Sequence, residues 1–105
     1  MSPADIAIPS VVLYELEVGI AQSNQPSKRR AQLDALLAAV TILPFDTAAA
    51  KQAAEVSSSL RKSGTVIGPM DTLIAGIALA HGATLVTHNI GEFRRVRGLK
   101  LEDWY

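Results

Sequence analysis

Residues 69–81 form a run that is almost wholly apolar and carries a single charge, that of Asp71. No other Asp, Glu, Lys or Arg occurs between Lys62 and Glu92. A helix that is apolar on nearly every side is buried, so this run predicts a central helix of the fold. A carboxylate at the start of a buried helix requires compensation by a metal ion, a hydrogen-bond network or the helix N-terminus. Asp71 is therefore the first candidate functional residue.

Short strand patterns and helix patterns alternate along the rest of the chain. Apolar residues recur at helical spacing in three segments, residues 11–22, 28–39 and 47–62. Short apolar or β-branched runs predict strands at residues 6–8, 40–43, 84–87 and, more weakly, 99–101. Ser10 and Asp46 are expected to cap helices, and Gly64 to end one. Strands alternating with helices favour an α/β fold with a mainly parallel sheet covered by helices.

Composition narrows the class of protein. The length of 105 residues, 49% of them apolar, fits a single domain with a core of its own. Ten basic residues balance ten acidic ones, so net charge alone does not favour a nucleic acid or an anionic membrane as partner. The chain has no cysteine, which excludes disulfides and thiolate metal sites and suits the cytoplasm. No leader and no membrane-spanning stretch is apparent in the sequence, so we expect no membrane partner.

Four polar residues stand in apolar surroundings or just after a strand, namely Glu15, Asp71, Asn89 and Glu92. Ligands of an open parallel sheet bind beyond the carboxyl ends of its strands, where these side chains are expected to converge. Oxygen ligands without cysteine or a histidine pair suit Mg²⁺ or Mn²⁺ rather than zinc. Such a metal can activate water and offset charge on a phosphodiester.

Each of these residues also has a simpler interpretation. Asp71 can be a first-turn acid favoured by the helix dipole, and Glu15 and Glu92 can be solvated surface acids. Asn89 can be an ordinary turn residue after a strand. The basic cluster at residues 94–100 can contact RNA phosphates or can be only a solvated face. The residue pattern alone leaves these alternatives open.

Four segments resemble, in the right order, the motifs of PIN-domain toxins of the VapC type. Residues 64–75 (GTVIGPMDTLIA) resemble the central motif of that family, and residues 85–96 (LVTHNIGEFRRV) resemble its last motif. Residues 8–19 (IPSVVLYELEVG) are similar to the segment that holds the family's glutamate, and residues 98–104 (GLKLEDW) to its tail. The resemblance covers essentially the whole chain.

The resemblance implies a PIN-like parallel sheet flanked by helices and a metal-dependent endoribonuclease of a type II toxin–antitoxin system. It implies Mg²⁺ or Mn²⁺ as cofactor, RNA as substrate, a cognate antitoxin as partner and a homodimer. Glu15 and Asp71 would hold the metal as the family's glutamate and central aspartate. Asn89 would take the fourth, often acidic, position with Glu92 nearby, and Thr87 would lie on the floor of the site.

One departure from the family is expected at the start of the chain. Family members open with a strand that ends in an aspartate, whereas the resemblance here begins after that unit, and Asp5 precedes the strand that leads to Glu15. We therefore expect residues 1–105 to form an N-terminally incomplete PIN-like domain that lacks the family's first strand, first helix and first metal-binding aspartate. An alternative function is a catalytically impaired remnant that binds an antitoxin or another PIN subunit. A third is a structural α/β domain whose acids are caps and surface groups.

Overall fold

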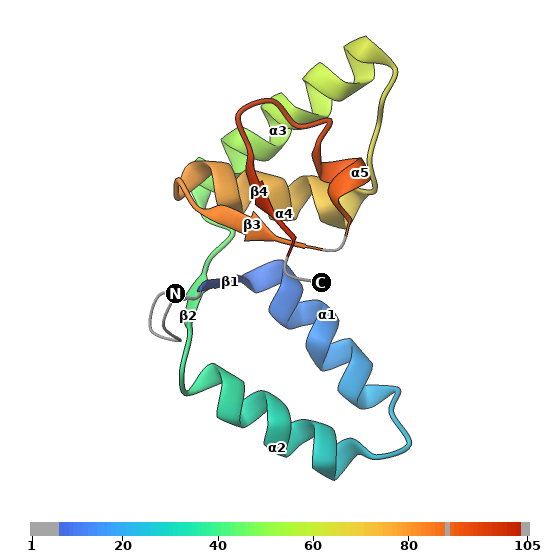
Figure 1. The fold of residues 1–105 in the computed structure, drawn as a ribbon, viewed down its shortest axis with the longest axis vertical. Helices are drawn as coiled ribbons and strands as arrows, with labels where there is room; N and C mark the ends of the chain where they lie inside the picture. The colour runs from blue at the N-terminus through green and yellow to red at the C-terminus, as the bar shows by residue number, and fades with distance from the viewer. Residues whose placement is uncertain (1–6, 88, 104–105) are drawn as a thin grey trace. The chain divides into compact units, whose positions relative to one another are not determined.

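The computed structural model describes residues 7–87 and 89–103 of the chain (Figure 1). Its contacts form two compact units, Met1–Leu43 and Pro44–Tyr105. Among the described residues each unit holds one two-stranded sheet, and both sheets are parallel.

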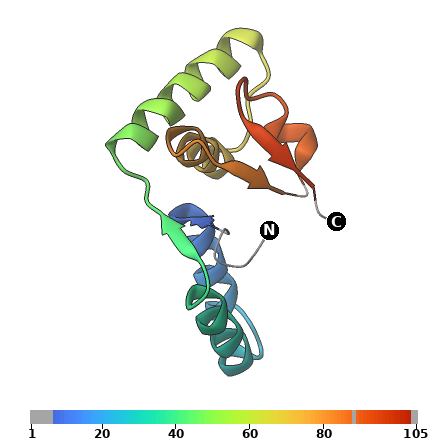
Figure 2. The same ribbon diagram turned by 60° about the vertical axis from the view of Figure 1, so that its left-hand side comes forward.

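The first unit has a strand–helix–helix–strand order. Its elements are β1 (Ala7–Pro9), α1 (Ser10–Ala21), α2 (Pro26–Leu37) and β2 (Thr41–Leu43). β1 and β2 pair in parallel with Ile8 opposite Ile42. Helices α1 and α2 contact each other; Figure 1 shows them converging toward the loop that joins them, and the two overlap in the view of Figure 2. Val11 and Leu33 are buried, and an ion pair between Glu17 of α1 and Arg30 of α2 links the two helices near the surface.

Helix starts in the first unit differ from the sequence prediction. The prediction that Ser10 caps α1 is wrong, because the helix begins at Ser10 itself and Pro9 is the last non-helical residue. The proline ring fixes φ of Pro9 at −60°, and its ψ of 140° is not helical. Pro9 is therefore the residue that precedes the helix, one position earlier than predicted. α2 begins at Pro26, ahead of the predicted residue 28, because proline suits the first position of a helix, where its missing N–H has no partner to lose.

The second unit contains the longest helix and the apolar helix predicted around Asp71. Its elements are α3 (Thr47–Ser63), α4 (Pro69–Ala80), β3 (Thr84–Val86), α5 (Ile90–Phe93) and β4 (Lys100–Glu102). Both predictions for the ends of α3 are confirmed. Asp46 Oδ1 accepts a hydrogen bond from the Ala49 N–H at 2.9 Å, and Gly64 ends the helix at a left-handed φ of 70°.

Close packing of α4 against α3 forms the core of the second unit. The middle of α4, Ile74–Ala78, is buried, and Ile77 has no exposed surface. Ala49 and Ala53 of α3 face this stretch at Gly76, where an added Cβ would lie 2.6 Å from the Ala53 Cβ. The absence of a side chain at Gly76 therefore lets the two helix backbones approach closely. The prediction that this apolar run is buried is confirmed for its middle, whereas Pro69, Met70 and His81 at its ends are exposed.

The second sheet follows directly from α4. β3 pairs in parallel with β4, with Leu85 opposite Leu101, and Figure 1 shows the two strands adjacent. The predicted α/β class with parallel strands is confirmed, whereas the single domain spanning the whole chain stays a prediction. No helix in the described part of the chain is long and apolar enough to cross a membrane. Predictions that involve Asp5, Ile6 and Trp104 lie outside the described residues.

Candidate active site

Asp71 lies in the first turn of α4, where the sequence placed it. Gly68 is the last residue before the helix, and its carbonyl oxygen accepts hydrogen bonds from both the N–H and the Oγ1 of Thr72, each at 3.0 Å. Pro69 occupies the first helical position. Asp71 is thus held on a well-formed helix start, at the end where the helix dipole favours a negative charge.

Glu92 lies on the short helix α5, which follows β3, and Asn89 is the residue just before that helix. Phe93 and Val96 are 3% and 5% exposed, so apolar anchors hold α5 and the turn after it against the unit. The Asn89 Nδ2 donates a hydrogen bond to Oε2 of Glu92, and the Asn89 N–H donates to Thr87 Oγ1 at 3.0 Å. Asn89 therefore orients the Glu92 carboxylate, and Thr87 orients Asn89.

The carboxyl groups of Asp71 and Glu92 meet in this arrangement. The pKa of Glu92 is lowered, chiefly by a hydrogen bond with the Asp71 carboxyl and next by the hydrogen bond from Asn89. The Gly68 backbone and the positive charge of Arg95 lower this pKa further. The structure thus brings together three of the four residues singled out in the sequence, from the start of α4 and from α5.

Two carboxyl groups at hydrogen-bonding distance repel each other unless a proton or a cation lies between them. Here the surrounding donors are oxygens and an amide, with no thiolate and no histidine pair, and this set suits a hard divalent cation. Asp71, Glu92 and the Asn89 side-chain oxygen therefore fit the metal that the fold family implies. The described residues form no cluster of three or more His, Cys, Asp or Glu, so this unit supplies only part of a carboxylate shell.

Comparisons with known proteins agree with this geometry. The PIN domain family model matches residues 1–99. The chain belongs to the PIN-domain family, and within it to the VapC type. It is 36% identical over 104 residues to the tRNA(fMet)-specific endonuclease VapC of Shigella flexneri, and the match covers 99% of this chain and 79% of that protein.

Solved structures of VapC-type proteins have the same fold as this PIN domain. A chain of VapBC2 from Rickettsia felis, bound to a DNA fragment from its promoter, matches with a TM-score of 0.91 and 40% identity. That match covers 95% of this chain and 75% of the other. A chain of VapBC-5 from Mycobacterium tuberculosis, from the VapBC family of toxin–antitoxin systems, matches with a TM-score of 0.76 and 28% identity, covering 92% of this chain and 79% of the other.

Glu15, the fourth predicted site residue, lies on α1 in the first unit of the PIN domain. Its side chain is exposed and lines a pocket of about 490 Å³ between α1 and α2, together with Leu16, Ile20 and Leu36. The Glu15 side chain is therefore accessible to solvent within its own unit. Its membership of the same site as Asp71 stays a prediction.

Sequence reasoning missed two contributors to the site. Gly68 was assigned no role of its own within the motif at residues 64–75, yet its backbone forms a hydrogen bond with Glu92. Arg95 seemed one member of a basic cluster, yet its Nη1 donates a hydrogen bond to the Val66 carbonyl oxygen at 3.2 Å. The position of Arg95, three residues after Glu92, was the available signal, because the turn after α5 brings the Arg95 N–H onto the Glu92 carbonyl oxygen.

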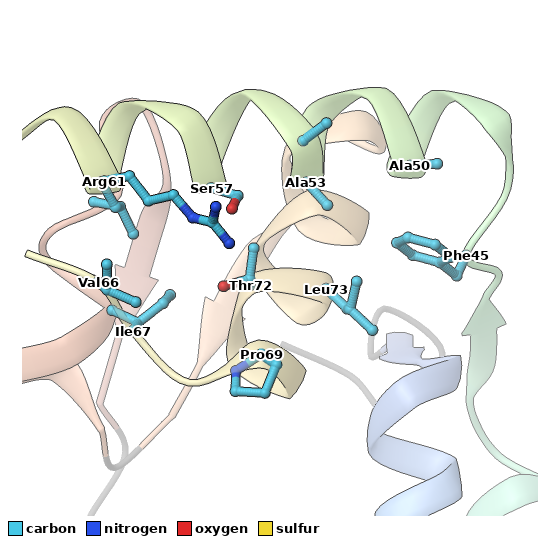
Figure 3. A pocket seen from close by; sticks show the side chains of 12 residues that line it. Phe45, Ala50, Ala53, Ser57, Arg61, Val66, Ile67, Pro69, Thr72 and Leu73 are labelled. Atoms are coloured by element: carbon cyan, nitrogen blue, oxygen red, sulfur yellow. The ribbon is translucent and has the colours of Figure 1, made fainter.

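A separate apolar pocket of about 450 Å³ lies between α3 and α4 of this PIN domain (Figure 3). Phe45, Val66 and Leu73 line it, and the Arg61 guanidinium points toward its middle. The residues that line it include none of Asp71, Asn89 and Glu92. This pocket is therefore distinct from the carboxylate site.

Proposed function

We propose that this chain is a metal-dependent endoribonuclease, the toxin of a type II toxin–antitoxin pair. The observation that carries the proposal is the meeting of the Asp71 and Glu92 carboxyl groups beside Asn89. It is supported by the relative from Shigella flexneri, which is named as an endonuclease specific for tRNA(fMet). The proposed substrate is RNA; the fold does not determine which RNA is cleaved, because one fold serves many substrates.

Three side chains of the second unit have defined roles in this proposal. Asp71 and Glu92 hold the divalent metal, and Asn89 keeps the Glu92 carboxylate turned toward Asp71. The pKa of Glu92 is lowered by its surroundings, which favour the ionised carboxylate, the form that a metal ligand requires. Glu15 is proposed as a further metal ligand from the first unit, on the strength of the family motif around it.

The metal we propose is Mg²⁺ or Mn²⁺. Carboxylate and amide oxygens are the ligands that these hard cations prefer. When bound, such a metal lowers the pKa of water and offsets the negative charge that develops on a phosphodiester. The role of the protein side chains would be to hold the metal ion beside the phosphodiester.

The proposed partners are a cognate antitoxin and a second copy of the chain. The similar structures from Rickettsia felis and Mycobacterium tuberculosis are of VapBC proteins, and the second is described as part of a toxin–antitoxin family. Tyr14, Leu16 and Leu36 of the first unit are 55%, 39% and 38% exposed, and exposed apolar side chains of this size favour a protein contact. We also propose that the protein works in the cytoplasm, where it would meet its proposed RNA substrate.

The test of the enzyme proposal is RNA cleavage by the purified chain. Single-stranded RNA is incubated with the protein and Mn²⁺, with and without EDTA, beside the variants Asp71→Asn and Glu55→Gln. Glu55 is exposed on α3, and its replacement removes the same charge away from the site. We expect cleavage that EDTA abolishes, that Asp71→Asn loses and that Glu55→Gln retains. Absence of cleavage, together with binding to the product of the adjacent small gene, would instead support a binding module.

A further inference from the structure

Arg95 makes a side-chain hydrogen bond that joins the turn after α5 to the segment between α3 and α4. Its Nη1 donates to the Val66 carbonyl oxygen at 3.2 Å, across a sequence separation of 29 residues. The Arg95 backbone is fixed in turn, since its N–H donates to the Glu92 carbonyl oxygen at 3.1 Å and the next residue, Val96, is buried. Arg95 thus connects two parts of the chain that carry different site residues.

The segment that Arg95 holds leads directly to Asp71. Residues 65–68 have no helix or strand structure of their own, and the Val66 side chain is 59% exposed, so side-chain packing contributes little to holding that residue. Ile67, which is 4% exposed, anchors the segment on its other side. Gly68 then ends the segment, starts α4 and faces Glu92. A shift at Val66 would therefore be transmitted to both partners of the carboxyl pair.

We infer that Arg95 is a positioning residue that sets the separation of Asp71 and Glu92 by tying the Val66 carbonyl group to the turn after α5. The inference rests on the proposed function, because the pair is the proposed metal site. Residues that orient metal ligands from outside the ligand shell commonly change metal affinity by about 10–100-fold when they are replaced. An exposed hydrogen bond such as this one is expected at the lower end of that range.

A simple charge effect makes the opposite prediction. The positive charge of Arg95 lowers the pKa of Glu92, so the two groups interact electrostatically. If charge were its only role, removing the guanidinium would strengthen the binding of a cation, because one repulsive charge would be lost. If Arg95 positions the pair, the same removal weakens binding, because the two carboxylates are no longer held at a common distance. The direction of the change in metal affinity therefore separates the two roles.

The test measures Mn²⁺ binding to the full chain by calorimetry and by the electron paramagnetic resonance signal of free Mn²⁺. The variants are Arg95→Ala, Arg95→Lys and, as matched control, Arg94→Ala. Arg94 is exposed, and among the described residues its side chain forms no hydrogen bond or ion pair. We expect Mn²⁺ affinity to fall about tenfold in Arg95→Ala, to recover partly in Arg95→Lys, and to change less than about twofold in Arg94→Ala.

Amide hydrogen exchange provides a readout that needs no metal. Arg95→Ala is expected to speed exchange in residues 65–68, whereas Arg94→Ala is expected to leave it unchanged, with both variants shown to be folded by circular dichroism. Unchanged exchange, or Mn²⁺ affinity that is equal or higher in Arg95→Ala, overturns the inference. A wild-type chain that binds no Mn²⁺ overturns the proposed function instead, and exchange then still decides whether Arg95 fixes the segment.

Discussion

The contact at Gly76 allows a sharp test of how the second unit is packed. A Cβ placed on Gly76 would lie 2.6 Å from the Ala53 Cβ, 2.7 Å from the Ala49 carbonyl oxygen and 2.8 Å from the Ala53 nitrogen. Two of these three atoms belong to the backbone of α3 and cannot rotate away. To bring the 2.6 Å contact to an ordinary 3.4 Å, the helices must separate by about 0.8 Å. Gly76→Ala is therefore expected to destabilise the protein.

Two opposing effects set the size of this loss. Alanine is favoured over glycine inside a helix by about 1 kcal/mol, which on its own would stabilise the variant. Overpacking of a close core contact costs about 1–3 kcal/mol, and a contact with backbone atoms belongs in the upper part of that range. The net expectation is a loss of about 1–2 kcal/mol in the free energy of unfolding. For a small domain this lowers the melting temperature by roughly 4–8 °C per kcal/mol.

Gly19→Ala is the matched control for this substitution. Gly19 lies inside α1, and apart from its chain neighbours and the backbone of its own helix no atom approaches within 4 Å of the Cβ position there. The helix preference of alanine then acts alone and should stabilise the protein by about 0.5–1 kcal/mol. Both variants are compared by urea unfolding followed by circular dichroism. A Gly76→Ala variant that gains as much stability as Gly19→Ala would refute the close approach of α3 and α4.

Three further variants test other features of the fold and the site. Asp46→Ala removes the hydrogen bond to the Ala49 N–H and should lower stability by about 1 kcal/mol in thermal unfolding, and an unchanged midpoint would contradict the capping role. The pKa of Glu17 is lowered by its hydrogen bond with Arg30, so that pair stabilises the fold at neutral pH and the contribution is lost as pH falls through the lowered pKa, below the usual 4.5. Glu17→Gln should therefore be slightly less stable than wild type at pH 7 and equal to it in strong acid, and a difference that persists there would contradict the pairing. Asp71→Asn should melt at a higher temperature than wild type in EDTA, because the repulsion with the second carboxylate is gone, and should lose the stabilisation that Mn²⁺ gives the wild type.

The second unit was predictable from sequence because local signals dominate there. Asp46 marks the start of α3 by a side-chain hydrogen bond to the helix end, and Gly64 marks its end by a left-handed backbone conformation. Both effects are local, so the residue types suffice to predict the boundaries. The apolar run that contains Asp71 had to be buried for any fold of this chain. The predicted limits of these two helices agree with the structure to within a residue.

Side-chain burial in the first unit was harder to predict. The spacing of Leu16 and Leu36 favours the inner face of a helix, yet their side chains are 39% and 38% exposed. Periodicity shows which residues share a face, but the neighbouring element decides how much of that face is covered. The start of α2 at Pro26 was obscured because residues 23–27 have the composition of a loop.

The prediction for the site was strongest where an apolar neighbourhood isolated a charge. Asp71 stood out for that reason, whereas Glu92 looked like a surface acid and Arg95 like part of a solvated basic run. Their roles depend on a contact between residues 65–68 and the turn after α5, and no local pattern encodes that contact. Pairings between distant segments are set by the tertiary fold, which is why the sequence identified the acids and Asn89 but not the contributions of Gly68 and Arg95.

The carboxyl pair itself argues against the simplest interpretation of Asp71. An acid that served only the helix dipole would gain nothing from a second carboxylate beside it, because like charges at that distance repel. Here Glu92 is not merely nearby, since Asn89 donates a hydrogen bond to it and the positive charge of Arg95 lowers its pKa. Two further side chains, Asn89 and Arg95, thus favour an arrangement of two acids that is unfavourable until a cation or a proton lies between them. That cost is explained if the arrangement serves to bind a metal, and a dipole role alone leaves it without a physical cause.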